Sequence, residues 1–246
     1  MVTVAGLDSK KLKKTCILFG FEDVLVPNGA SGAFNEKPVL EILKNLSELE
    51  KKDPNFHFGL LTGLPKEKFD AKVAKTKLAG FFDSKKIFSV DQSYLDSKSK
   101  MDLDLYQKNV KANPEFKDEY FKQIAIDEVS ERYSVPKEKM VYVGNDLLFA
   151  AFYTSRYSKI DVALIKDSVS LRGEKTENTV SGLIYINRNW KDIQKLLLGK
   201  FSPVDYSELT KFIQKWLEQQ LLKTDSIKLI PGNRKKTEQE KQNESP

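Results

Sequence analysis

The fold is decided by the stretch Cys16-Ile17-Leu18-Phe19-Gly20-Phe21-Glu22-Asp23-Val24-Leu25, which Pro27-Asn28-Gly29 interrupts soon afterwards. Its first four residues are apolar without a break, which is typical of a strand buried on both faces of a parallel sheet. We therefore predict a central strand over residues 15–21. In an open parallel sheet the functional site lies beyond the carboxyl ends of the strands, where Glu22 follows this one.

Strand-like and helix-like segments alternate along the rest of the chain. Apolar runs predict further strands over residues 56–61, 86–90, 140–143, 161–165 and 182–186. Apolar positions at helical spacing predict a helix that begins near Pro38 and stops at Asp53, and further helices over residues 66–78, 116–133, 147–153 and 190–198. This alternation predicts a doubly wound α/β fold with a parallel sheet.

The chain also divides into segments of different composition. Residues 1–13 are interpreted as a polar lead-in and residues 14–199 as the α/β core. Within the core, residues 91–118 are polar and only weakly amphipathic, which indicates an insertion or an irregular connection. Residues 200–223 predict an extra C-terminal helix. Residues 224–246 are rich in Lys, Glu, Gln, Asn and Ser, so we expect this tail to be disordered.

Composition limits the class of protein. The 246 residues are 40% hydrophobic, enough for a sizeable core, and the single cysteine, Cys16, allows no internal disulfide. No apolar run approaches the ~20 residues that span a bilayer, and no secretory signal is evident. We therefore expect a cytoplasmic protein that does not associate with membranes. His57, the only histidine, is given no functional role.

The stretch after Cys16 resembles the first motif of the haloacid-dehalogenase (HAD) superfamily, an apolar strand that ends in Asp-x-Asp-x-Thr/Val-Leu. In that family the first Asp attacks phosphorus and the second acts as acid and base, while Mg²⁺ is bound beside them. Residues two apart on a strand point the same way, so both carboxylates face one phosphoryl group. Here the two positions are Gly20 and Glu22. The resemblance implies a HAD-like Rossmannoid core with at most a small cap, and it leaves only Glu22 as a vestigial catalytic carboxylate.

The second and third motifs of the family are phosphate-binding. Thr62 and Gly63, at the end of a predicted strand, match the second motif, whose hydroxyl and backbone N–H groups hold phosphate at a helix N-terminus. The alternative is that Thr62 only caps the following helix. Lys117 is the first choice for the phosphate-neutralising lysine of the third motif, and Lys122 is the second.

The fourth motif of the family supplies acidic metal ligands. The matching segment reads Gly144-Asn145-Asp146, and Phe149 stands at a later position that is usually acidic. Asn145 offers only a neutral oxygen to Mg²⁺, and Asp146 keeps a carboxylate. The resemblance therefore implies a metal site at Asn145 and Asp146 that is weak or lost.

These substitutions lead to one expected function and two alternatives. We expect a catalytically inactive HAD-like protein that acts as a binding or scaffolding module in a larger assembly, with a protein partner and no cofactor. The first alternative is a Mg²⁺-dependent phosphohydrolase of altered or weak activity that uses Glu22, Thr62 and Asp146. The second is a basic factor that associates with RNA or a ribonucleoprotein, since the net charge is +6, although lysines spread over a solvated surface are the preferred explanation of that charge.

Overall fold

The computed structural model describes residues 3–4, 7–22, 24–26, 36–112, 117–145, 154, 158–165, 183–200 and 211. The chain divides into two units, Met1–Tyr206 and Ser207–Pro246, and the first is described below. The helices predicted over residues 147–153 and 200–223, and the predicted disordered tail at 224–246, lie outside the described residues.

The core of the first unit is a six-stranded parallel sheet in the order β5-β4-β3-β6-β7-β8. The strands are β3 (Cys16–Phe19), β4 (His57–Thr62), β5 (Ile87–Ser89), β6 (Met140–Gly144), β7 (Asp161–Ile165) and β8 (Leu183–Ile186). The chain winds outward from β3 in one direction through β4 and β5, and then in the other through β6, β7 and β8. This reversal defines a doubly wound fold, so the predicted fold class is confirmed.

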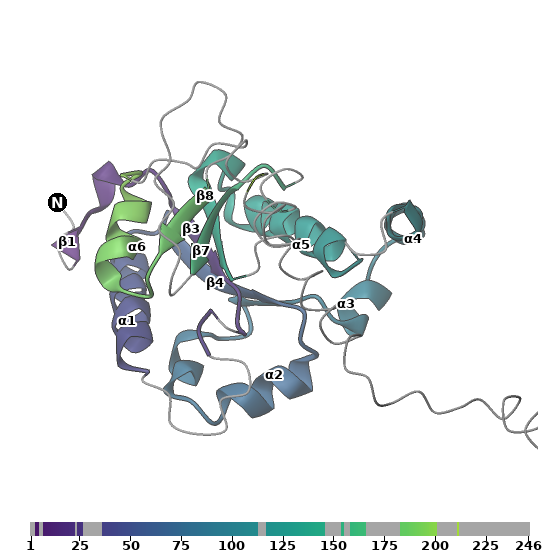
Figure 1. The fold of residues 1–246 in the computed structure, drawn as a ribbon, viewed down its shortest axis with the longest axis horizontal. Helices are drawn as coiled ribbons and strands as arrows, with labels where there is room; N and C mark the ends of the chain where they lie inside the picture. The colour runs from purple at the N-terminus through teal and green to yellow at the C-terminus, as the bar shows by residue number, and fades with distance from the viewer. Residues whose placement is uncertain are drawn as a thin grey trace, which may run out of the picture. The chain divides into compact units, whose positions relative to one another are not determined.

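Both faces of the sheet are buried. Ile17 of β3 pairs in register with Phe58 and Val141, and all three side chains belong to one hydrophobic core. Helices α1 (Lys37–Lys52) and α6 (Trp190–Leu197) lie side by side over this face, and α5 (Lys117–Tyr133) lies on the opposite side (Figure 1). Cys16 and Leu18 point to that opposite face and are also fully buried. Burial on both faces explains why the sequence of β3 is apolar without alternation.

The segment after β4 differs from its prediction. The sequence pattern predicts one helix over residues 66–78, whereas α2 (Lys66–Val73) ends five residues earlier. A separate 3-10 helix, η2 (Lys77–Phe81), follows, because the Thr76 hydroxyl accepts the backbone N–H of Leu78 at 3.2 Å and starts a new turn. The apolar residues therefore keep their helical spacing in the sequence although the α-helix itself is interrupted between Val73 and Lys77.

Two segments hold more regular structure than the sequence indicates. Residues 91–118 include α3 (Gln92–Asp96) and α4 (Lys100–Ala112), so this part of the chain is not an irregular connection. The predicted lead-in, residues 1–13, includes the short antiparallel pair β1 (Thr3–Val4) and β2 (Leu7–Asp8), followed by η1 (Ser9–Lys11). None of the helices in the described ranges is long and apolar enough to cross a membrane.

Candidate functional site

The predicted motif positions lie at the carboxyl ends of neighbouring strands. Gly20 directly follows β3, Thr62 ends β4, and Asn145 directly follows β6. Because β3 lies between β4 and β6 and all three are parallel, these ends meet at one edge of the sheet. We call this edge the strand-end crevice. Asp146 and Phe149 of the fourth motif lie outside the described residues.

Gly20 has little room for a side chain. A Cβ atom built on Gly20 would lie 3.0 Å from the Tyr142 hydroxyl oxygen and 3.1 Å from Cγ2 of Val24. Tyr142 pairs in register with Leu18, so its side chain points to the same face of the sheet as a side chain at position 20 would. The side chain of Tyr142 is buried, with 4% of its surface exposed. Its hydroxyl group therefore fills the space where the family places its nucleophile.

At position 20 a side chain is disfavoured by the lack of space and not by the backbone conformation. Among the described glycines only Gly199 has a positive φ, at +63°. A Cβ atom on Gly63, the other motif glycine, would meet no atom within 4 Å. Of these two motif glycines, only Gly20 is thus closely packed.

The turn that follows Gly20 packs onto α2. The Phe21 carbonyl accepts the backbone N–H groups of Leu25, at 3.0 Å, and Val26, at 3.1 Å. The Phe21 ring contacts the ring of Phe69 edge-on, with 4.9 Å between centroids. Hydrogen bonds and aromatic packing therefore fix the position of Glu22 within the turn.

Glu22 forms an ion pair with Lys72 of α2. The two side chains are 35% and 44% exposed, so the pair is solvated. The carboxylate that occupies the acid/base position is already bound to an ammonium group, which also brings a positive charge to the crevice. This arrangement matches an ion-paired surface acid more closely than a free general acid or base.

The Thr62 hydroxyl serves the backbone of its own turn. Thr62 is 5% exposed, and its Oγ1 accepts the Leu64 N–H at 3.1 Å. The alternative prediction, that Thr62 caps the following helix, is wrong, because α2 begins at Lys66 after an N-cap at Pro65. The hydroxyl oxygen thus already accepts the Leu64 N–H, a donor for which a bound phosphate would have to compete.

Asp91 joins the N-termini of two helices beside Thr62. Its Oδ2 accepts the backbone N–H of Lys66, the first residue of α2, at 3.2 Å. Its Oδ1 accepts the N–H of Tyr94 in α3 at 3.0 Å. A carboxylate of the chain itself therefore occupies the helix end where the second motif would bind the phosphate anion.

The two candidate lysines of the third motif lie on α5, which begins at Lys117. This helix ends at Tyr133, whose ring stacks on His57 at the amino end of β4, with 4.2 Å between centroids. The start of α5 is therefore the end nearer the crevice. The role of either side chain stays a prediction.

The described residues do not fit the magnesium site of the HAD family. Gly20 contributes no ligand, the Glu22 carboxylate is paired with Lys72, and Asn145 offers a neutral oxygen. Within the described ranges no group of three His, Cys, Asp or Glu side chains could hold a metal ion. A metal ligand at Asp146 would lie outside those ranges and stays a prediction.

Three residues that shape this edge were missed from the sequence. Tyr142 could have been inferred, because it lies in a strand adjacent to β3 and on the same face as Gly20. Asp91 could also have been inferred, because it follows the end of β5 and precedes a helical segment as an N-cap. Lys72 gave no signal, since the chain holds 41 Lys and Arg residues with no feature to set this one apart.

Solved structures of low sequence identity match most of the chain, each with a TM-score below 0.5. A 4-nitrophenylphosphatase from Thermotoga maritima is 12% identical, with 74% of this chain and 97% of that one covered and a TM-score of 0.43. An uncharacterized protein from Listeria monocytogenes serotype 4b is 16% identical, with 76% and 99% covered and a TM-score of 0.47. The cobalt-bound deoxy-D-mannose-octulosonate 8-phosphate phosphatase from Haemophilus influenzae is 13% identical, with 78% and 91% covered and a TM-score of 0.41. No protein-family model and no curated protein matches the chain.

With TM-scores below 0.5, these similarities carry no activity over to this chain. The strand order and the placement of Gly20, Thr62 and Asn145 at adjacent strand ends agree with the HAD-like fold implied by the sequence resemblance. The chemistry of the crevice must be judged from its own residues.

Proposed function

We propose that this protein of HAD-like fold lacks HAD-type phosphoryl-transfer activity and acts as a binding or scaffolding module in a larger assembly. The observation that carries the proposal is the contact between position 20 and Tyr142. A nucleophilic carboxylate at position 20 would require the Tyr142 hydroxyl and the Val24 methyl group to move. Without that carboxylate no aspartyl-phosphate can form at this position.

The state of the neighbouring groups supports the same proposal. Glu22 is paired with Lys72, Thr62 accepts a hydrogen bond from Leu64, and Asp91 occupies the start of α2. Each of these three groups thus has an internal partner. A substrate would have to displace these contacts before it could bind.

Hydrolysis of an aryl phosphate in the presence of Mg²⁺ tests the catalytic part of the proposal. The wild-type chain, Asp146→Ala and Glu22→Gln should all give the same rate as buffer. Turnover in the wild type that depends on Mg²⁺ and is lost in both variants would contradict the proposal. That result would instead support the weak phosphohydrolase that relies on Glu22 and Asp146.

The size of the protein in extracts of its native cells tests the binding part. In size-exclusion chromatography the native chain should elute earlier than the purified chain, because a partner is bound. Elution of both at the same volume would contradict a role in a stable assembly.

A further inference from the structure

A pocket of about 460 Å³ opens at the amino ends of the strands, at the edge of the sheet opposite the strand-end crevice. Thr15 lies just before β3, Asn55 just before β4 and Lys139 just before β6. A strand of about five residues spans roughly 17 Å. The length of the strands therefore separates this amino-end pocket from the strand-end crevice. The two sites share no lining residue.

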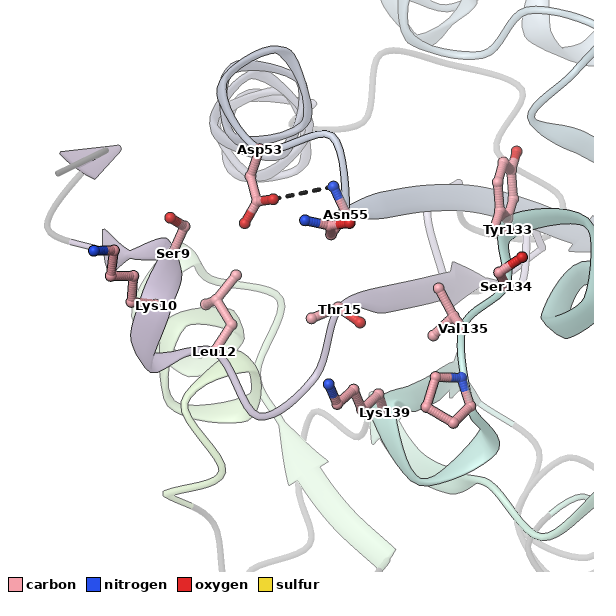
Figure 2. A pocket seen from close by; sticks show the side chains of 11 residues that line it. Ser9, Lys10, Leu12, Thr15, Asp53, Asn55, Tyr133, Ser134, Val135 and Lys139 are labelled. Atoms are coloured by element: carbon pink, nitrogen blue, oxygen red, sulfur yellow. Dashed lines mark hydrogen bonds between the residues drawn. The ribbon is translucent and has the colours of Figure 1, made fainter.

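Charged and polar side chains surround the amino-end pocket. Figure 2 shows Asp53 on one side of the opening and Lys139 on the other, with Thr15 between them. Asn55 lies beside Asp53, and Lys10 of η1 lines the far side of the opening with its ammonium group turned away from Thr15 and Lys139. In the described part of the chain no carboxylate pairs with the ammonium group of Lys139 or Lys10. A bound anion would therefore not need to displace an internal partner.

Backbone hydrogen bonds hold the walls of the pocket in place. The Lys139 carbonyl accepts the Thr15 N–H at 2.9 Å, and the Thr15 carbonyl accepts the His57 N–H at 2.8 Å. Oδ1 of Asp53 accepts the Asn55 N–H at 3.0 Å. Such a preformed site loses little conformational entropy when a ligand binds, and a volume of this size is typical of small-molecule sites.

The chemistry of the lining indicates the class of ligand. The ammonium group of Lys139 attracts an anionic group, and the Thr15 hydroxyl can donate to it. The Asp53 carboxylate only accepts hydrogen bonds, so it requires donors such as ligand hydroxyl groups and disfavours a second anionic group near it. We propose that the amino-end pocket binds a small hydroxylated anion of the sugar-phosphate type.

This site is independent of the proposed function. Its lining includes none of the crevice residues Gly20, Glu22 and Thr62, so loss of phosphoryl chemistry there has no bearing on binding here. The Leu12, Val135 and Pro136 side chains add an apolar surface against which a carbon skeleton can pack.

Isothermal titration calorimetry with the full chain tests the proposal, with glucose 6-phosphate as the probe and glucose and inorganic phosphate as its two halves. The wild type should bind glucose 6-phosphate saturably and bind each half at least about tenfold more weakly. Lys139→Ala and Asp53→Asn should each weaken binding of the probe by about tenfold or more. Lys139→Met, which keeps most of the side chain and removes only the charge, provides a second variant if Lys139→Ala does not fold.

Two matched variants locate the binding site. Lys68→Ala removes another exposed ammonium group, on α2, and Thr62→Val alters the strand-end crevice; both should bind the probe within about twofold of the wild type. Absence of saturable binding up to about 10 mM would overturn the proposal. Equal loss in Lys68→Ala and Lys139→Ala would overturn it too, as would inorganic phosphate binding as tightly as the sugar phosphate.

Discussion

The hydroxyl oxygen of Tyr142 lies 3.0 Å from the point where a Cβ atom on Gly20 would stand. Two neighbouring parallel strands, β3 and β6, bring these residues together, because position 20 and position 142 face the same side of the sheet. The space for a nucleophile at the head of the first motif is thus taken by a side chain from the neighbouring strand. Where the family has an aspartate, this chain has Gly20, and the Tyr142 side chain packs close to the position that the aspartate side chain would take.

Asp91→Ala is expected to destabilise the protein, because the Asp91 carboxylate caps α2 and α3 together. Loss of one cap typically costs about 1 kcal/mol, so loss of both should lower the free energy of unfolding by about 2 kcal/mol. Urea denaturation measures the change. Asp104→Ala, at an exposed position on α4, is the matched control and should change stability by less than about 0.5 kcal/mol. Equal effects of the two substitutions would show that the caps contribute nothing.

Ser134→Gly is expected to stabilise the protein by about 0.5–1 kcal/mol. Ser134 directly follows α5 with φ at +51°, a conformation that glycine adopts without strain. Gly199 has the same role after α6, with φ at +63°, and a Cβ atom there would also lie 3.0 Å from Cγ of Lys13. Gly199→Ala should therefore destabilise the protein by about 1 kcal/mol or more. Thermal unfolding should show a higher melting temperature for Ser134→Gly and a lower one for Gly199→Ala. A loss of stability in Ser134→Gly would contradict the prediction for that residue.

Acidification is expected to destabilise the protein through His57. Burial lowers the pKa of the His57 imidazole, and the charges of Glu50 and Asp53 oppose this change only in part. Because the unfolded chain takes up a proton at higher pH than the folded one, stability is greatest above the ordinary histidine pKa of about 6.5 and falls as the pH drops below it. Urea denaturation between about pH 7.5 and pH 5 measures this loss.

The same titration with His57→Gln identifies the group responsible. The variant should lose less stability over this pH range than the wild type, because glutamine takes up no proton. Parallel curves for the two proteins would assign the acid sensitivity to other groups.

The sequence was sufficient to predict the sheet and the positions at its carboxyl edge. The unbroken apolar run of β3, the regular alternation of strands and helices, and the polar residues after β4 and β6 are local signals, and the parallel topology brings them to one edge. The placement of Thr62 and Asn145 followed from the same reasoning. The fold therefore needed no information about long-range contacts.

The state of those groups could not be predicted in the same way. The Glu22–Lys72 pair joins residues fifty positions apart, and any of several lysines on α2 satisfies the sequence pattern equally well. The break after Val73 depends on one hydroxyl group of Thr76, although the apolar spacing continues through it. Contacts between side chains from distant segments decide whether a carboxylate is free or paired, and composition does not specify them.

A double-mutant cycle on Gly20→Ala and Tyr142→Phe tests most directly whether Tyr142 fills the nucleophile's place. Gly20→Ala alone should lower the free energy of unfolding by about 1–3 kcal/mol, because the new methyl group is overpacked. Gly63→Ala, which meets no atom within 4 Å, is the control and should have little effect. In the Tyr142→Phe background the cost of Gly20→Ala should fall by at least about 0.5 kcal/mol, because the contacting oxygen is gone. Additive effects of the two substitutions, or a Gly20→Ala protein as stable as the wild type, would contradict the account.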